Sequence, residues 1–442
     1  MNWLKTTVGE FCSFIYGKSI KKDDQVDRGI PVYGSNGIYT YAEKKLAGAH
    51  SVIIGRKGSV GKVHISNTPC WVSDTAFYVE NKSLEEAYFT YYLLSSLGLE
   101  DMNTDAAVPG LNRNNAHRLE IEIPESEIER KHLIQPLINL DEKIQLNHQI
   151  NQTLEQIAQA LFKSWFVDFD PVKAKIDVLE AGGSEEEALL AAMQVISSKN
   201  AEELAAFEVE KPEEYAELRA TAALFPAVMV ESELGEIPEG WEVGALADVA
   251  DLNKNSWTKR NLPVEIEYVD LANTKNGIIE LTTPYLSDEA PSRARRKLMD
   301  GDTIVGTVRP GNRSFAFIKK PSDILTGSTG FAVLSPKKKI YAEFIYIAAT
   351  SDEAISRLAH LADGGAYPAV RSDVVSGLVT VIPEEEVLDY FHSLVSPFFE
   401  LSERFHIESL TLKKLRDTLL PKLLSGEITF TEILLDEGGV NV

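Results

Sequence analysis

The sequence predicts an α+β fold, in which two β-rich mixed globular domains are separated by two long helices that pair as an antiparallel coiled coil. Three observations lead to this prediction. The chain of 442 residues contains one pattern twice, each copy consists of short apolar runs between Gly, Pro and Asn residues, and a long segment with heptad-like spacing follows each copy. Hydrophobic residues make up 44% and charged residues 25%, which excludes wholesale disorder.

The two copies are recognised by the spacing of their ends. Pro109 and Pro124 in the first copy match Pro368 and Pro383 in the second, both at one offset of 259 residues, and Ile precedes Pro124 and Pro383 alike. Both copies also begin with a tryptophan, followed by matching apolar and acidic positions. Chance similarity between two β-rich stretches is the alternative, but the shared spacing favours two diverged copies of one domain.

Each copy has the texture of short strands with one helical segment. Apolar runs at residues 51–54 and 302–305 are bounded by turn residues, which is typical of buried strands. Amphipathic spacing predicts one helix at residues 85–97 and one at residues 342–361. We therefore expect two mixed domains of similar construction.

A long helix is predicted after each copy, at residues 125–167 and 384–425, because apolar residues recur at steps of three and four. A narrow apolar stripe on so long a helix requires a partner, so we expect the two helices to pair, with Asn147 and Glu408 in the seam fixing the register. The alternative is that each helix packs only on its own globule, and Pro136 and Pro397 either bend the helices or mark their starts. The predicted interface residues are Leu137, Leu140, Ile144, Leu154, Ile157, Leu161, Phe398, Leu401, Phe405, Leu412, Leu415 and Leu419.

The charge is strongly segregated along the chain. The formal net charge is −23, but residues 1–124 and 241–383 are close to neutral, whereas residues 168–240 hold 18 acidic and 5 basic residues. Ala-rich and Glu-rich stretches in this acidic segment favour helix. It is interpreted either as a solvated helical connector or as a docking surface for a partner protein. The total charge does not exclude DNA as a partner, provided that the acidic blocks face away from it.

The sequence contains no constellation of residues with the spacing of a known catalytic or metal site. Residues 55–62 resemble a phosphate-binding loop, but the glycine spacing is one residue too long and Val63 replaces the hydroxyl residue that would bind magnesium. No catalytic or metal-ligating residue is predicted, so the pattern favours a binding protein. Two cysteines, no apolar run of membrane-spanning length and no signal-like N-terminus predict a cytoplasmic protein that does not contact a membrane.

Turn-rich segments in both copies carry side chains that read or hold DNA. Arginine pairs with guanine and asparagine with adenine, whereas lysine and serine mainly contact phosphates. A basic loop by itself is more often simply solvated, but the recurrence of such loops in both copies favours double-stranded DNA as a partner. The candidate DNA-binding residues are Ser35, Asn36, Arg56, Lys57, Lys62, Asn112, Arg113, Asn114, Lys259, Arg260, Arg293, Arg295, Arg296, Arg309, Arg313, Tyr367 and Arg371.

Three segments resemble those of a known family. They are LFKSWFVDFDPVKAK at residues 161–175, IPEGWEV at residues 237–243 and LRDTLLPKLLSGEI at residues 415–428. Together with the two-copy order, they resemble the specificity (S) subunit of type I restriction–modification systems over nearly the whole chain. The acidic connector is longer than the short linker that this resemblance implies.

The resemblance implies a domain organisation and a function. It implies a first target recognition domain (1–124), a central spacer helix (125–167), the acidic connector (168–240), a second target recognition domain (241–383), a distal spacer helix (384–425) and a C-terminal tail (426–442). Such a subunit reads a bipartite DNA target and has no catalytic site or bound cofactor of its own. It directs two methyltransferase (M) subunits and restriction (R) subunits, which bind S-adenosylmethionine, ATP and Mg²⁺. The alternative is a non-catalytic coiled-coil scaffold that does not read bases.

Overall fold

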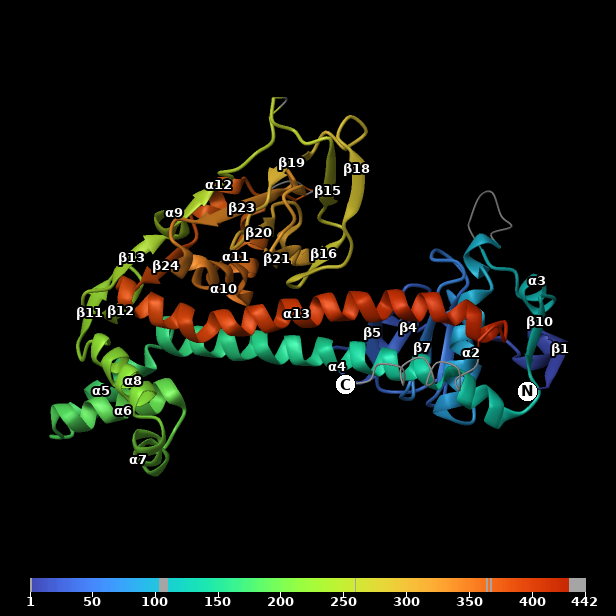
Figure 1. Cartoon of the computed structure of the whole chain (residues 1–442), viewed down its shortest axis with the longest axis horizontal. Helices are drawn as coiled ribbons and strands as arrows, with labels where there is room; N and C mark the ends of the chain where they lie inside the picture. The colour runs from blue at the N-terminus through green and yellow to red at the C-terminus, as the bar shows by residue number, and fades with distance from the viewer. Residues whose placement is uncertain (1, 103–109, 259, 363–364, 366–367, 429–442) are drawn as a thin grey trace, which may run out of the picture. The chain divides into compact units, whose positions relative to one another are not determined.

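The computed structural model of the chain describes residues 2–102, 110–258, 260–362, 365 and 368–428. The chain forms two compact units: one contains Met1–His148 and His406–Val442, and the other contains Gln149–Phe405. Two helices of 40 residues, α4 (Glu127–Phe166) and α13 (Glu385–Leu424), each contribute one part to each unit (Figure 1). The predicted α+β class with two β-rich domains and two long helices is therefore confirmed.

The first unit contains the first β-rich domain. Its first and last strands pair antiparallel, Trp3 opposite Pro124, and two four-stranded sheets have the orders β2-β9-β6-β7 and β3-β5-β4-β8. The elements are β1 (Trp3–Thr7), α1 (Val8–Phe11), β2 (Ile15–Tyr16), η1 (Lys22–Asp24), β3 (Gln25–Val26), β4 (Ile30–Gly34), β5 (Gly37–Ala42), β6 (Ser51–Gly55), β7 (Val63–Ser66), β8 (Trp71–Val72), β9 (Ala76–Glu80), α2 (Leu84–Ser96), η2 (Leu99–Asp101), α3 (Arg113–His117) and β10 (Glu120–Pro124).

The core of this unit lies between the first sheet, α2 and the long helices. Every residue of β6 is buried, which explains its continuous apolar sequence. Phe89 and Leu94 of α2, Leu137 of α4 and Leu423 of α13 belong to the same buried cluster as this sheet. The long helices therefore help to form the core of the domain, in addition to pairing with each other.

The second β-rich domain, in the second unit, repeats most of this topology, but the fourth strand of its second sheet lies at the opposite edge. Its first and last strands pair antiparallel, Glu242 opposite Ile382, and its sheets have the orders β14-β23-β20-β21 and β18-β15-β22-β19. The elements are β13 (Glu242–Ala245), α9 (Leu246–Val249), β14 (Ala250–Leu252), β15 (Glu265–Val269), β16 (Thr274–Lys275), β17 (Ile278–Ile279), β18 (Thr283–Leu286), β19 (Ala294–Lys297), β20 (Thr303–Gly306), η3 (Pro310–Asn312), β21 (Phe315–Phe317), β22 (Leu325–Ser328), β23 (Phe331–Pro336), η4 (Lys339–Tyr341), α10 (Ala342–Thr350), α11 (Asp352–Leu361), α12 (Ser372–Ser376) and β24 (Val379–Ile382).

The correspondence between the two domains extends to strand direction. In both, the second sheet contains one parallel pair, β4 with β8 and β15 with β22. The internal repeat predicted from the sequence is therefore confirmed. One helix prediction was wrong in detail: residues 342–361 form two helices, because the hydroxyl of Ser351 accepts a hydrogen bond from the backbone N–H of Ala354 and starts a new helix.

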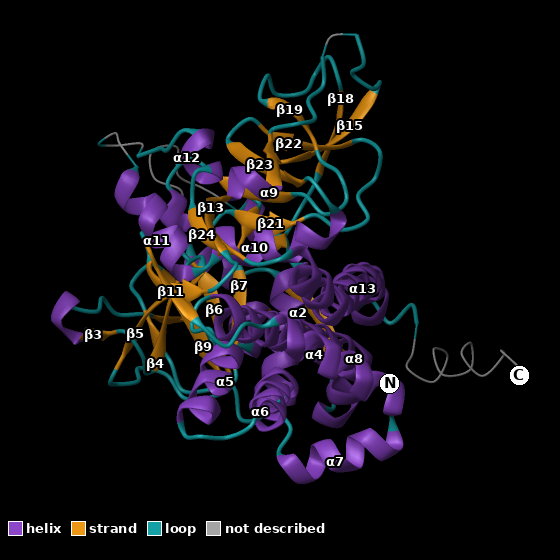
Figure 2. Cartoon of the chain, turned by 90° about the vertical axis from the view of Figure 1, so that its left-hand side faces the viewer, coloured by secondary structure: helices purple, strands orange, loops and turns teal. Residues whose placement is uncertain are grey.

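The acidic segment between the domains folds as a group of helices with a hairpin, within the second unit (Figure 2). Capping boxes begin two of these helices, Ser184 with Glu187 and Asn200 with Glu203, so part of the acidic charge serves helix formation. Lys175 is buried and donates to the backbone carbonyl of Phe225. The elements are α5 (Asp170–Glu180), α6 (Glu185–Ser197), α7 (Ala201–Glu210), α8 (Pro212–Leu224), β11 (Met229–Ser232) and β12 (Gly235–Pro238).

An aromatic cluster joins the end of α4, the start of α13, the connector and the second domain. Trp165 is fully buried; its ring is stacked on Tyr390 with centroids 6.1 Å apart, and Phe225 meets it edge-on at 5.3 Å. Phe166 lies 6.0 Å from Trp241, so the aromatic residues of the segments 161–175 and 237–243 pack together. These sequence motifs are therefore explained by packing.

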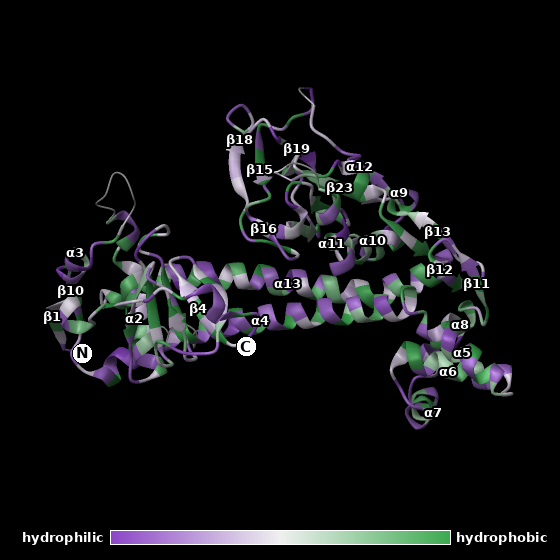
Figure 3. Ribbon diagram, turned by 180° about the vertical axis from the view of Figure 1, so that it is seen from behind, coloured by the Kyte–Doolittle hydropathy of each residue, from purple (hydrophilic) through white to green (hydrophobic). Residues whose placement is uncertain are grey.

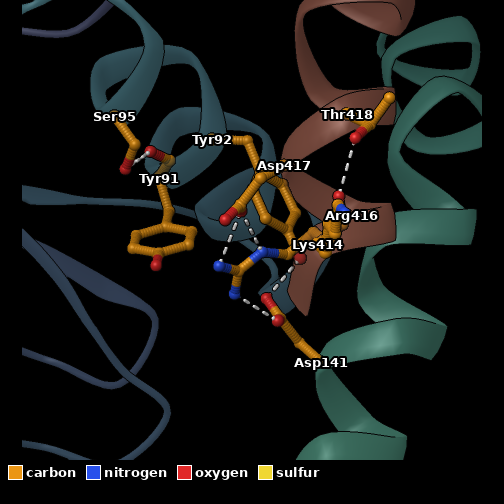
Figure 4. Close-up of polar contacts among 8 residues, drawn as sticks. All are labelled: Tyr91, Tyr92, Ser95, Asp141, Lys414, Arg416, Asp417 and Thr418. Atoms are coloured by element: carbon orange, nitrogen blue, oxygen red, sulfur yellow. Dashed lines mark hydrogen bonds and ion pairs between the residues drawn. The ribbon is translucent and has the colours of Figure 1, made fainter. Parts of the chain in front are cut away.

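The long helices pair antiparallel in each unit. In the first unit, Asp141 binds Arg416 at 2.7 Å and Asn147 donates to the Glu408 carboxylate at 2.7 Å. The Tyr92 hydroxyl donates to the same Asp141, so α2 joins the contact between the helices (Figure 4). In the second unit, Asn151 donates to the backbone carbonyl of Ser402 at 3.1 Å, and Phe162 faces Phe391. Residue numbers fall on α13 as they rise on α4, and the prediction that Asn147 and Glu408 lie in the seam is confirmed.

The predicted interface residues differ in burial. Both long helices carry polar and apolar residues along their length (Figure 3). Two are buried, Leu137 and Ile144. The half-buried ones are Leu140, Leu154, Leu161, Phe398, Leu401, Phe405, Leu412 and Leu419.

Two of the predicted interface residues lie outside the buried seam: Ile157 is 42% exposed and Leu415 is 46% exposed. Next to Ile157, the small Ala158 is fully buried. Next to Leu415, Arg416 turns inward to bind Asp141. The prediction was wrong at these two positions because the neighbouring residue occupies the seam. Pro136 and Pro397 lie inside the helices and mark neither start.

Candidate nucleic-acid interface

In the first domain, two basic loops that are distant in sequence lie side by side. The loop after β6 carries Arg56 and Lys57, and the segment before α3 contains Gly110 and Leu111. The backbone N–H of Leu111 donates to the carbonyl of Arg56 at 2.8 Å, and Lys57 forms an isolated β-bridge with Gly110. The structure therefore joins two of the three predicted basic clusters of this domain.

The third cluster, Ser35 and Asn36, lies at the same place. The Lys62 ammonium donates to the side-chain carbonyl of Asn36 at 3.0 Å. The backbone N–H groups of Arg56 and Lys57 both donate to the carbonyl of Thr75. A hollow of about 330 Å³ lies against this region and is lined by Gly34, Ser35, Asn36, Gly37, Ile38, Tyr39, Ser73, Asp74 and Thr75.

The turn after β6 requires a glycine. A Cβ atom at Gly55 would lie 2.0 Å from the backbone carbonyl oxygen of Ser59, a contact that no side chain tolerates. Gly58 also has a left-handed φ of +83°. The glycines that make residues 55–62 look like a phosphate-binding loop are thus explained by the close approach of backbone within the turn.

The second domain contains the same junction of loops. The backbone N–H of Val370 donates to the carbonyl of Thr307 at 2.9 Å, and Val308 forms a β-bridge with Ala369. Val370 and Ala369 match Leu111 and Gly110 at the offset of 259 residues. Thr307 and Val308 match Arg56 and Lys57 at an offset of 251 residues, which also relates the apolar runs before them. Arg309, with a left-handed φ of 48°, stands at the position of Gly58.

Asn112 and Asn114, in the first domain, have different surroundings. The side-chain oxygen of Asn112 caps α3, accepting hydrogen bonds from the backbone N–H groups of Asn114 and Asn115 at 2.9 and 3.2 Å. The side chain of Asn114 is exposed. Asn112 therefore has a structural role that the sequence prediction did not include.

The structure adds Tyr16 to the predicted residues of the first domain. Its ring is 46% exposed, and the guanidinium carbons of Arg56 and Arg113 each lie 5.0 Å from the ring centre. No basic residue stands directly beside Tyr16 in the sequence, so the search for basic clusters did not find it. Cation–π contact with both arginines shows that it belongs to the same surface.

In the second domain, two predicted arginines are paired with aspartates. Arg313 binds Asp352 at 2.7 Å and donates from Nε to Asn276 at 2.8 Å. Arg371, whose side chain is 82% exposed, forms a two-pronged pair with Asp373. The formal charge of each is therefore compensated by a neighbouring carboxylate.

The segment from Arg293 to Lys297 follows one edge of the second sheet. The backbone carbonyl of Arg293 accepts a hydrogen bond from the backbone N–H of Thr329. The next residue, Gly330, accepts a hydrogen bond from the backbone N–H of Thr307, which belongs to the loop junction. Arg293 therefore lies near that junction. The Lys297 ammonium lies 4.9 Å from the centre of the Trp257 ring.

Arg295 and Arg296 form hydrogen bonds to neighbouring residues, whereas the remaining predicted residues of this domain that the structure describes are not seen to contact this segment. Arg295 donates to the carbonyl of Ala294 and Arg296 donates to the hydroxyl of Ser256. Burial lowers the pKa of Arg296. Arg260 is exposed, and Lys259 and Tyr367 lie outside the described residues.

Other classes of site are not found in the part of the chain that the structure describes. Within it, no group of three or more His, Cys, Asp or Glu side chains could hold a metal ion. No described helix carries an apolar stretch of the length needed to cross a bilayer. Cys12 and Cys70 are buried free thiols, and burial raises their pKa values to about 12 and about 11.

Comparisons with known proteins agree with this geometry. Residues 1–156 match the family described as "Type I restriction modification DNA specificity domain". The chain is 35% identical over 331 residues to the type I restriction enzyme HindI specificity subunit of Haemophilus influenzae, covering 72% of this chain and 71% of that protein. It is 23% identical to the MjaIX specificity subunit of Methanocaldococcus jannaschii, covering 87% and 78%.

A solved structure has the same fold. The type I restriction–modification S subunit from M. genitalium superposes with a TM-score of 0.52 at 14% identity, covering 96% of each chain. The fold, the matching family domain and the similarity to HindI agree with the repeated loops described above. The chain therefore belongs to the specificity subunits of type I restriction enzymes, which are the non-catalytic subunits of these complexes.

Proposed function

We propose that this chain reads a bipartite double-stranded DNA target, one half with residues 1–124 and the other with residues 241–383. The observation that carries the proposal is the loop junction that recurs in both domains, Leu111 with Arg56 and Val370 with Thr307. Both junctions carry arginine side chains at the surface of a rigid sheet. Two equivalent surfaces in one chain fit a target that consists of two separate half-sites.

Different residue types at these surfaces fit different contacts with DNA. Lys57 and Lys62 fit phosphate contacts, which position the duplex and make binding sensitive to salt. Arginine and asparagine side chains fit the base edges of the major groove, which carry the sequence information. The acidic connector and the acidic parts of the long helices repel phosphates, so they would remain off the DNA.

The catalytic partners follow from the family. We propose that the chain binds two copies of an S-adenosylmethionine-dependent adenine methyltransferase subunit, and restriction subunits that use ATP and Mg²⁺. Its relatives are subunits of a restriction enzyme and of a restriction–modification system, and a subunit that reads the target needs others to cut and modify it. The partners would then bind these cofactors, and this chain would recognise the DNA sequence.

Exchange of one domain tests the proposal. Residues 1–124 are replaced by the matching domain of a relative with a different target, and the methylated motif is read by sequencing the genome of a host that also expresses the methyltransferase subunit. The expected result is a new motif in one half of the target and an unchanged other half. Exchange of residues 241–383 is the matched control, and it should change the opposite half.

Two outcomes would contradict the proposal. A scaffold that does not read bases would leave the motif unchanged in both exchanges. Simultaneous change of both half-sites after a single exchange would mean that the two domains do not read separate halves.

A further inference from the structure

The exposed Tyr16 ring holds two arginine side chains in the first domain. The guanidinium carbons of Arg56 and Arg113 each lie 5.0 Å from the ring centre, so twice that distance is the upper limit of their separation. Tyr16 ends β2 and is paired in register with Phe77 of β9. The Phe77 ring meets the Tyr16 ring edge-on at 4.9 Å, and Phe77 is buried. Tyr16 is therefore a fixed platform on the edge of the sheet.

Both arginines approach this platform from fixed backbone. Arg56 is held by hydrogen bonds from its N–H to Thr75 and from Leu111 to its carbonyl. Its Nη1 also donates to the carbonyl of Asp74 at 3.2 Å. Because arginine has five N–H donors, this single bond leaves the outer part of the guanidinium free to bind a ligand.

Arg113 begins α3, and the same helix also holds the strand that carries Tyr16. The ring nitrogen Nε2 of His117 accepts a hydrogen bond from the backbone N–H of Phe14 at 3.0 Å. Burial, and then the nearby Arg113 charge, lower the pKa of His117, which favours the neutral ring that this hydrogen bond requires. Arg113 itself reaches the Phe14 carbonyl at 3.5 Å.

Neither arginine has a carboxylate partner among the described residues, in contrast to the second domain. There, Arg313 is paired with Asp352 and Arg371 with Asp373. Two like charges beside one ring repel each other unless an anion or an electron-rich group is bound. The major-groove edge of guanine supplies such a group, through its O6 and N7 acceptors.

We infer that Tyr16, Arg56 and Arg113 form a guanine-reading site, so that the half-site of the first domain contains G·C pairs. The inference rests on the proposed function and deepens it by naming a base. The Tyr16 ring and the hydrogen-bonded backbone of Arg56 hold the guanidinium groups at this edge of the sheet, and an arginine held in place favours the two-pronged contact with one base edge. The upper limit of their separation corresponds to about three base-pair steps, at roughly 3.4 Å per step.

The test uses the complete complex of this chain with its methyltransferase subunit. A DNA library with both half-sites randomised is selected for binding, and the preferred bases are compared between variants. Arg56→Lys and Arg113→Lys keep the charge but remove the two-pronged contact. Each should lower the preference for guanine at one position of one half-site by roughly 5- to 150-fold.

Two tyrosine variants separate stacking from the hydroxyl group. Tyr16→Phe keeps the ring and should leave the selected motif unchanged. Tyr16→Leu removes the ring and should lower the preference for guanine by about 2- to 5-fold. Arg371→Lys, in the second domain, is the matched control and should leave the first half-site unchanged. Retention of the second half-site shows that each variant still folds and assembles.

The outcomes distinguish this inference from the proposed function. If the unsubstituted complex selects no sequence in the first half-site, the proposed function itself fails. If it selects a half-site without a G·C pair, or if both lysine variants weaken binding equally for all sequences, only the guanine site is wrong. Uniform weakening would assign Arg56 and Arg113 to phosphates.

Discussion

At the scale of single residues, the seam between the long helices combines apolar packing with buried polar groups. Asn147 is fully buried and donates to Glu408 at 2.7 Å and to the Ser409 hydroxyl at 3.3 Å. Such a group stabilises one register only, because a shifted helix would leave its amide without these partners. Asn147 therefore selects the alignment of α4 on α13.

Replacement of Asn147 by alanine should lower the stability of the helix pair. Asn147→Ala leaves the Ser409 hydroxyl without this donor in a buried position, and we expect the free energy of unfolding to fall by about 1–3 kcal/mol. Urea unfolding followed by helical circular dichroism measures the change. Gln145→Ala, at an exposed position of the same helix, should change it by less than about 0.5 kcal/mol. Equal effects of the two substitutions would show that the buried amide does not contribute.

The residues of the candidate nucleic-acid interface could be predicted only in part from the sequence. Basic and amide residues in turns indicated the loops at residues 55–62 and 110–114, and the structure brings these loops together. Tyr16 could not be predicted, because it is near Arg56 and Arg113 only after the sheet has formed. The pairing of Arg313 with Asp352 was also hidden, since 39 residues separate them in the chain.

At the scale of elements, the heptad spacing predicted the two helices and their pairing, but not which neighbour of each apolar residue enters the seam. Ala158 and Arg416 take the places expected for Ile157 and Leu415. An apolar pattern does not show that an arginine will turn inward to an aspartate. The repeat predicted two domains of similar construction, but the order of the strands in their sheets became known only from the structure.

The helix pair also contains two histidines whose pKa values are lowered. Burial, and then the charge of Lys413, lower the pKa of both His148 and His406 below the ordinary 6.5. The charge of His148 lowers the pKa of His406 further. As the pH decreases through about 6.5, these two histidines bind protons in the unfolded chain before they do so in the folded chain. The free energy of unfolding contributed by this pair therefore falls as the pH decreases through about 6.5.

The prediction is tested with the double variant His148→Gln/His406→Gln. Its free energy of unfolding should depend less on pH, between about pH 7.5 and about pH 5.5, than that of the unsubstituted chain. His132→Gln, at an exposed position of α4, is the control and should retain the full dependence. Identical pH profiles for the double variant and the unsubstituted chain would mean that other groups cause the dependence.

At the scale of the whole molecule, an overall charge of −23 opposes binding to a polyanion, so the acidic connector should slow the approach of DNA. We expect Glu202→Gln/Glu208→Gln/Glu210→Gln to increase the association rate with any duplex several-fold at about 0.01 M salt, and to have no effect at about 1 M. These three side chains are exposed, while Glu203 is kept because it caps α7. Stopped-flow fluorescence measures the rate. A changed target motif in this variant would instead show that the connector contacts bases.

One backbone feature of the second domain has a wider consequence. Arg309 adopts a left-handed conformation where the first domain has a glycine, and such a conformation costs a residue with a Cβ atom about 1–2 kcal/mol. A glycine there would make the domain more stable, so this turn is not optimised for folding. The domain adopts this turn nonetheless, so the other contacts of the domain outweigh its cost. A loss of stability that persists in a surface turn is expected where the turn is under selection for binding rather than for folding.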